Sequence, residues 1–218
     1  EVKHIGVFRL ALVIIDFTFV AYLIPGMFGA PLKALAGYLP PIESQDFVVW
    51  NTRSGSMPSA GPVSQVNENK YGLEMPLGLS GYFNLDEGLA AAKAAGKPVF
   101  VDITGHGCVN CREMEQRVWS DPRVLEILRN EYILVALYTD DKTKLPESEW
   151  VTAENGKVLK DMGRINSYVA RNRFGVNAQP NYVLLSPDGA QLMPIRGYNL
   201  DVDGFIEFLK SGLAKVAK

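Results

Sequence analysis

The chain has 218 residues, which is enough for one large domain or for one medium domain with appendages. Its formal net charge is −2, and no run of Lys and Arg is interleaved with aromatic residues, so we expect no nucleic-acid partner. Only two cysteines are present, Cys108 and Cys111. A bridge between positions so close in sequence closes too small a loop to stabilise a fold, so redox chemistry explains the pair better.

Metal binding is the minor alternative for these cysteines. A structural zinc site normally takes about four ligands, and beside the thiols stands only one imidazole, that of His106. Haem attachment would need a histidine directly after Cys111, where Arg112 stands instead. We therefore expect no metal, and no cofactor other than a redox-active Cys108–Cys111 disulfide.

Near the N-terminus, residues 5–28 are apolar except for Arg9, Asp16 and Thr18, and this length suffices to cross a hydrocarbon core of about 30 Å as a helix. The pattern predicts a membrane span. Asp16 lies near its middle, where a carboxylate is costly unless it faces other helices, so we expect the span to pack in a larger bundle. Lys3 and Arg9 lie before or at the start of the span, against Lys33 after it, and this weak bias places the N-terminus in the cytoplasm and the rest outside.

A signal peptide and a buried soluble helix are the alternatives for this segment. A signal peptide would explain the small residues at 34–36, but its apolar region is normally only about 7–15 residues long. A buried soluble helix is rarely apolar on every face over such a length. We therefore expect a membrane-spanning and exit segment at 1–40, a Gly-, Pro- and Ser-rich linker at 41–80 with a candidate strand at 47–50, and a compact domain at 81–218.

The compact domain alternates helix and strand signals. Capping residues and amphipathic runs predict helices, and short apolar runs predict strands. The expected helices are 84–96, one that begins at the cysteines, one from Pro122 to about 130, 165–173 and 202–217; the expected strands are 97–104, 133–138, 181–186 and 192–196, the last two joined by a turn at 187–189. Residues 139–163 are polar and are predicted to be an irregular insertion. This order predicts an α/β fold with a mixed sheet.

The motif Cys108-Val-Asn-Cys111 follows a predicted buried strand and opens the next helix, which is typical of thioredoxin-like redox sites. The N–H groups at a helix N-terminus stabilise a thiolate and can lower a thiol pKa from about 8.5 to about 7 or below. Cys108 would then attack a partner disulfide, and Cys111, one turn further in and more shielded, would resolve the mixed disulfide. Incidental spacing of two cysteines is the alternative.

From about residue 81 to its end, the chain resembles the C-terminal thioredoxin-like domain of the DsbD-type thiol:disulfide interchange proteins. The resemblance is carried by KPVFVDITGHGCVNCREMEQRVWSDPRV and VNAQPNYVLLSPDG, while LIPGMFGAPLKALAGYLPP looks like the last membrane helix of such a protein and its exit. The resemblance implies a thioredoxin-like fold, a central mixed sheet flanked by helices, after a transmembrane helix and a linker. It also implies that Cys108 is the attacking thiol and Cys111 the second one.

The resemblance further implies two carboxyl groups beside the cysteines. An acidic residue six positions before the first cysteine corresponds to Asp102, and one seven positions after it corresponds to Glu115. A carboxyl buried under the site would have a raised pKa and could relay a proton to or from the resolving thiol. Asp102 could instead be a structurally paired strand-end residue. For Glu115 a surface position is the alternative, since Arg112, Glu113 and Arg117 indicate a solvated helix face.

Four residues are expected to meet the substrate. Pro180 matches the proline that is cis in thioredoxin folds, and Gln179 before it could offer backbone hydrogen bonds to an extended peptide. An ordinary trans-proline that starts a strand is the alternative. Gly107 stands where thioredoxins usually carry a Trp, which makes the entry loop more permissive. His106 could stabilise a thiolate when protonated, or could be a plain exposed loop residue.

These features predict a membrane-tethered protein-disulfide reductase of the bacterial inner membrane, with its thioredoxin-like domain on the periplasmic side. The resemblance implies that electrons arrive from cytoplasmic thioredoxin through a membrane electron-donor domain with cysteines of its own, which are not in this chain. The expected partners are that domain, membrane lipid and protein disulfide substrates, and cytochrome c biogenesis, isomerase reduction or repair would all use the same residues. A thiol oxidase or isomerase, and a non-enzymatic module that binds extended peptides or a metal, are the alternatives.

Overall fold

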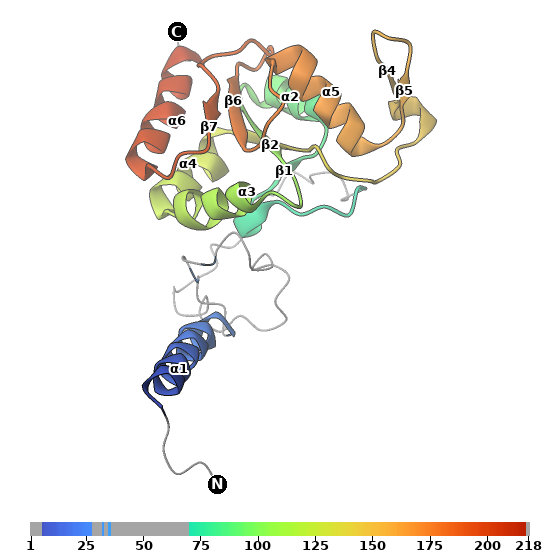
Figure 1. Cartoon of the computed structure of the whole chain (residues 1–218). Helices are drawn as coiled ribbons and strands as arrows, with labels where there is room; N and C mark the ends of the chain where they lie inside the picture. Colours follow the sequence, from blue (N-terminus) through green and yellow to red (C-terminus); the bar gives the residue numbers. More distant parts are fainter. Residues whose placement is uncertain (1–5, 28–31, 33–34, 36–69, 217–218) are drawn as a thin grey trace.

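The computed structural model describes residues 6–27, 32, 35 and 70–216 (Figure 1). The first described element is the helix α1, Val7–Met27, in which no residue is buried. By length and composition this helix could cross a membrane, as the sequence predicts. The candidate strand at 47–50 and the expected linker up to residue 69 lie outside the described residues.

A five-stranded sheet forms the centre of the compact domain. Its strand order is β1-β3-β2-β6-β7, where β1 is Gly81–Tyr82, β3 is Ile133–Tyr138, β2 is Val99–Thr104, β6 is Asn181–Leu185 and β7 is Arg196–Gly197. Strands β1 and β2 both run parallel to β3, whereas β6 runs antiparallel to β2 and to β7. The sheet is therefore mixed, which confirms the predicted fold class.

Helices cover both faces of this sheet (Figure 1). On one face pack α2, Leu85–Ala95, and α5, Met162–Phe174. On the other face pack α3, Val109–Met114, α4, Pro122–Glu131, and α6, Val202–Val216. Each face therefore has its own apolar core, and α3, which begins at the cysteine motif, belongs to the second one.

Local capping signals set the ends of the helices. The side chain of Asn84 accepts two backbone N–H groups at the start of α2, and Gly96 ends that helix with a φ of 64°, as the sequence predicts. Helix α5 begins at Met162 rather than at residue 165, because the carboxylate of Asp161 caps its first turn. The predicted boundary was wrong there because a capping aspartate in a polar stretch looks like one more loop residue.

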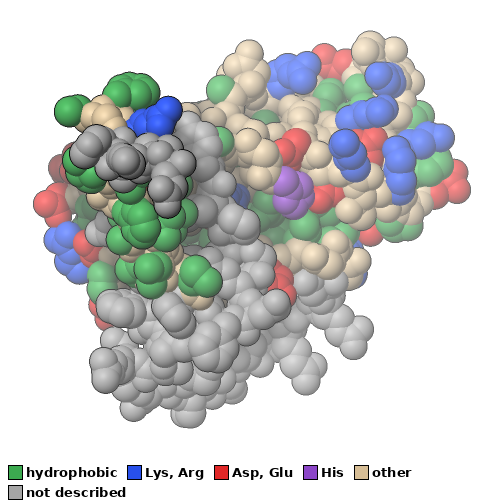
Figure 2. Space-filling model, turned by 60° about the horizontal axis from the view of Figure 1, so that its bottom comes forward, with side chains coloured by type: hydrophobic (Ala, Val, Ile, Leu, Met, Phe, Trp, Pro, Cys, Tyr) green, Lys and Arg blue, Asp and Glu red, His purple; other side chains and the backbone are tan. Residues whose placement is uncertain are grey.

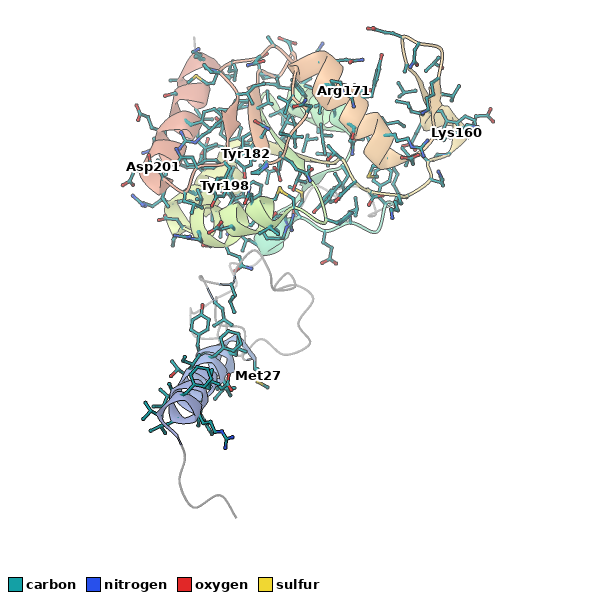
Figure 3. All side chains as sticks on the ribbon, viewed as in Figure 1. Met27, Lys160, Arg171, Tyr182, Tyr198 and Asp201 are labelled. Atoms are coloured by element: carbon teal, nitrogen blue, oxygen red, sulfur yellow. A yellow bond between two sulfur atoms is a disulfide. The ribbon has the colours of Figure 1, made fainter. Side chains whose placement is uncertain are left out.

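Side chains alternate between the two faces along β2, and this alternation places Asp102. Val101 and Ile103 point into the core under α2 and α5, and Phe100 points into the opposite core. Asp102 therefore lies on the same face as Phe100, the face that α3 covers. On β6 the partner of Asp102 in register is Tyr182, which Figure 3 labels within that core.

The segment 139–163 is more regular than its polar sequence indicates. It holds a short antiparallel hairpin of β4, Val151–Thr152, and β5, Val158–Leu159, after a 3-10 turn at Glu147–Glu149. We call the segment 139–163 the insertion. Its apolar cluster is separate from the two main cores and consists of Leu145, Leu159, Met162 and Ile165. Most of the segment is irregular, as predicted, but the sequence did not predict the hairpin, since α5 supplies half of the residues in the cluster that buries it.

Two further segments lie outside the central strands, one ahead of β1 and one after β6. Ahead of Gly81, the side chains of Met75 and Leu79 lie in the core beneath α4 and α6. After β6 the predicted hairpin forms. Its second strand was expected at 192–196, but β7 begins only at Arg196, the last residue of that range, and ends at Gly197.

Candidate functional site

Cys108 and Cys111 are joined by a disulfide at the start of α3. Cys108 is the N-cap residue of the helix, and its sulfur accepts a hydrogen bond from the N–H of Cys111 at 3.1 Å. The exposed fraction is 7% for Cys108 and 2% for Cys111. The first cysteine is thus the more accessible of the two, as the sequence predicts, and it already sits where a backbone N–H can stabilise a charge on its sulfur.

The loop from β2 to Cys108 is held by a carboxylate that sequence reasoning missed. The two carboxylate oxygens of Asp140 accept the N–H groups of His106 and Gly107 at 2.8 and 2.9 Å. Asp140 follows β3, and β3 runs parallel to β2, so both loops leave the same edge of the sheet. The signal that could have pointed to this contact was the pair Asp140 and Asp141, which closely follows the predicted strand 133–138.

His106 is tied to its surroundings rather than free in the loop. Its Nε2 lies 2.8 Å from an oxygen of Asp141, and its ring stacks on Tyr138 with the ring centroids 4.4 Å apart. Burial raises the pKa of Asp141, but the hydrogen bonds from His106 and Thr143 outweigh burial and hold this pKa below its ordinary value. His106 is thus an exposed loop residue, half of its side chain being open to solvent, but it is held in place by these contacts. Its effect on a thiolate stays a prediction.

Asp102 is buried on the face of the sheet that α3 covers. Its side chain is 3% exposed, and its Oδ1 has no hydrogen-bond partner. Burial raises the pKa of Asp102 to about 7, and the charge of Arg112 only partly opposes that rise. Two phenols share this space: burial raises the pKa of Tyr138 to about 12, and it raises the pKa of Tyr182 well above the ordinary value. Both phenols therefore stay neutral, and Asp102 is the group that titrates near neutral pH.

Glu115 is buried, so the surface position considered for it was wrong. Its exposed fraction is 6%, and its carboxylate pairs with Arg112 at 2.8 Å. Arg112 also turns inward, which the sequence did not predict, and donates a long hydrogen bond of 3.4 Å to Thr104. Glu113 of α3 and Arg117 in the following turn lie nearer the solvent and pair with each other at 2.7 Å.

The peptide bond between Gln179 and Pro180 is cis, as the resemblance implies. Asn181 pairs with Ile103 in the antiparallel ladder, so Pro180 comes next to the end of β2 from which the cysteine loop leaves. The side-chain oxygen of Gln179 accepts a hydrogen bond from the hydroxyl of Thr139 at 2.6 Å. Within residues 70–216 the backbone of Gln179 makes no hydrogen bond to another backbone group, so its N–H and C=O remain available to a peptide.

Among the described residues, no group of three or more His, Cys, Asp and Glu side chains could hold a metal ion. The site therefore consists of a cysteine pair and a buried carboxyl on the sheet face that α3 covers.

A redox-active cysteine pair that follows a parallel strand and opens a helix defines the thioredoxin-like class of site. A family model described as a thioredoxin-like domain matches residues 85–212, more than half of the chain. The chain therefore belongs to the thioredoxin-like family, and its fold is that of disulfide oxidoreductases.

The relatives that match in sequence are named thiol:disulfide interchange proteins. DsbD of Ralstonia nicotianae is 40% identical over 57 residues, which cover 26% of this chain and 9% of that protein. DsbD 2 of Pseudomonas aeruginosa is 31% identical over 123 residues, which cover 56% of this chain and 17% of that protein. The chain thus spans less than a fifth of the length of these two curated relatives.

Two solved structures superpose on part of this chain at low sequence identity. A DsbH oxidoreductase superposes with a TM-score of 0.47 and 18% identity, over 65% of this chain and 91% of the other. The oxidised C-terminal domain of DsbD from Neisseria meningitidis superposes with a TM-score of 0.41 and 18% identity, over 61% of this chain and 99% of the other.

Proposed function

We propose that this protein is a membrane-tethered thiol:disulfide reductase of the DsbD type, which passes electrons from the Cys108–Cys111 dithiol to protein disulfides outside the cytoplasm. The observation that carries the proposal is Asp102, a buried carboxyl with an unbonded oxygen on the sheet face that α3 covers. Packing alone gives no reason to bury such a group, whereas an exchange reaction at the cysteines needs a proton acceptor there.

The reaction proceeds in two exchanges. In the reduced protein the thiolate of Cys108 attacks one sulfur of the partner disulfide, an S–S bond forms between them, and the partner's other sulfur leaves as a thiolate that takes a proton from water. Cys111 then loses its proton and attacks the sulfur of Cys108. This closes the Cys108–Cys111 disulfide seen in the structure and releases the partner's second thiol. Two electrons have then passed from this chain to the partner.

Asp102 is assigned the proton of Cys111. With a pKa of about 7, its carboxyl is partly ionised at neutral pH, so it can accept the thiol proton and release it afterwards. Glu115 is assigned a different role, since its carboxylate is paired with Arg112 at 2.8 Å. Arg112 is then a positioning residue, which compensates the charge of Glu115 and moderates the pKa of Asp102.

The substrate binds as an extended peptide beside Pro180. The unpaired backbone groups of Gln179 would bond the peptide as an added strand does. Gly107 has no side chain to cover the disulfide, so bulky folded partners can reach Cys108. This arrangement supports protein disulfides rather than one small molecule as the substrate class.

The proposed direction and location of the reaction are supported by the names of the relatives and by α1. The DsbD-named relatives favour reduction, and α1 would hold the domain at the periplasmic face of the bacterial inner membrane. Electrons would then reach Cys108 and Cys111 from a membrane domain with cysteines of its own, since this sequence contains no others.

The full chain in non-ionic detergent tests the proposal by its exchange activity and its reduction potential. Wild type should reduce a model disulfide, and Cys108→Ser should abolish that activity; activity unchanged in Cys108→Ser would refute the assignment. A reduction potential near the value of about −270 mV typical of thioredoxin is expected. A value near about −120 mV would instead identify an oxidase built on the same site.

A further inference from the structure

A basic cavity lies between the insertion and α5. It has a volume of about 780 Å³ and is walled by the residues that follow β3, by the hairpin of β4 and β5 and by one side of α5 as far as Arg171. Figure 2 shows Lys and Arg side chains gathered over one end of the molecule, and Figure 3 labels Arg171 on α5 and Lys160 on the insertion. The cations that line the cavity are Lys142, Lys144, Lys157, Arg164 and Arg171.

The carboxylates that line the same cavity are engaged in internal bonds. Asp140 and Asp141 hold the loop before the cysteines. Asp161 caps α5 and lies 3.5 Å from Lys144 and 3.1 Å from Arg164. Asp161 therefore offsets the charges of Lys144 and Arg164, and the oxygens of Asp140 and Asp141 are directed at the cysteine loop.

The other three cations have no such partner. Among residues 70–216, Lys142, Lys157 and Arg171 form no ion pair, and all three are exposed. Five cations and three carboxylates give the lining a net charge of +2, although the whole chain carries −2. Positive charge is thus concentrated in a hollow, where it attracts anions more strongly than isolated surface lysines do.

The cavity is continuous with the proposed peptide site. A second hollow of about 280 Å³ is lined by Gln179 and by three residues that also line the basic cavity, Thr139, Ser167 and Arg171. Thr139 in addition donates its hydroxyl to the side chain of Gln179. A peptide that leaves the backbone of Gln179 along this path therefore reaches the three unpaired cations.

We infer that the basic cavity binds an acidic segment of the protein whose disulfide is exchanged at Cys108. The inference rests on the proposed function and adds the class of substrate: a partner with Asp or Glu residues beside the reactive cysteine. Arg171 can bind a carboxylate through two parallel hydrogen bonds, and the lysines add attraction that draws the partner toward the site before contact.

Model peptides with an intermolecular disulfide test this inference on the full chain in non-ionic detergent. One peptide carries a run of Glu on each side of its cysteine, and its match carries Gln instead. Wild type should exchange the acidic peptide about tenfold faster at low salt, since charge complementarity acts mainly on the association rate. The preference should shrink as the ionic strength rises from about 0.02 M to about 0.5 M, because salt screens exposed charges.

The triple variant Lys142→Gln/Lys157→Gln/Arg171→Gln should lose this preference, so that its rate falls about tenfold more with the acidic peptide than with the Gln peptide. The matched control Lys93→Gln/Arg129→Gln/Lys210→Gln removes the same charge from exposed positions on α2, α4 and α6, and it should keep the preference. Equal rates for the two peptides in wild type, or equal losses in the two variants, would overturn the inference.

Binding of the same peptides with Ser in place of Cys, followed by fluorescence anisotropy, separates this inference from the proposed function. Tighter binding of the acidic peptide by wild type than by the triple variant supports the inference even if no exchange occurs. Binding of inorganic phosphate or of vesicles with anionic lipid that depends on the three cations, with no preference among the peptides, would overturn it.

Discussion

Replacing Asp102 by Asn should stabilise the oxidised protein above neutral pH. The substitution keeps the shape of the side chain and removes only its ability to ionise. Burial raises the pKa of Asp102 from 3.8 to about 7. Between these values the folded protein keeps a proton that the unfolded chain has released, so the free energy of unfolding of wild type falls as the pH rises.

The size of this fall follows from the shift. A difference of about three pH units between the folded and unfolded pKa corresponds to about 4 kcal/mol of stability, lost between about pH 4 and pH 7 and fully absent above that. The Asn variant has no such loss. It should therefore match wild type near pH 4 and exceed it by about 2–4 kcal/mol at pH 8.

Urea unfolding of the oxidised full chain at pH 4, 6 and 8 measures this difference without interference from thiols. Asp188→Asn is the control, since that carboxylate is 82% exposed in the turn after β6, and its difference from wild type should not vary with pH. A stability difference for Asp102→Asn that stays constant from pH 4 to pH 8 would refute the reasoning. In the exchange assay the same variant should lose at least about tenfold in rate, because Cys111 loses its proton acceptor.

Two further substitutions test the surroundings of the disulfide. Arg112→Gln removes the cation that pairs with the buried carboxylate of Glu115 and should cost about 3–5 kcal/mol in urea unfolding, with partial recovery in Arg112→Lys. Glu113→Gln, which breaks the more exposed pair with Arg117, should cost about 0.5 kcal/mol or less, and equal costs would contradict the burial of the Arg112–Glu115 pair. Gly105→Ala places a methyl group 2.6 Å from Nε2 of Gln179 and 2.9 Å from Asp140, so it should slow exchange several-fold. Gly107→Ala, where the nearest neighbour of the added methyl group is at 3.6 Å, should slow exchange less. Comparable rates for these two alanine variants would show that the close approach at Gly105 does not position the loop.

The parts of the fold that depend on short-range signals could be predicted from the sequence. Asn84 and Gly96 mark the ends of α2 by their own chemistry, and Pro122 marks the start of α4. The strand and the helix that flank the cysteines were predicted because the apolar run 97–104 and the spacing of Cys108 and Cys111 lie next to each other in the chain.

The parts of the fold and of the site that depend on contacts between distant segments could not be predicted from the sequence. The sequence spacing of Arg112 and Glu115 fits a surface ion pair equally well, and only the packing of α3 on the sheet turns it inward. The bonds from Asp140 to the cysteine loop join segments 33 and 34 residues apart. The insertion looked irregular for the same reason, since Met162 and Ile165 of α5 complete its apolar cluster.

The central claim, that Cys108 is the attacking thiol and Cys111 resolves it, is tested most directly by trapping the mixed disulfide. Reduced Cys111→Ser is incubated with a peptide disulfide, and the adduct is located by mass spectrometry after proteolysis. The adduct should form at Cys108 and persist, while Cys108→Ser should form little adduct, because Cys111 is only 2% exposed. Equal or faster formation of an adduct at Cys111 in Cys108→Ser would contradict the claim.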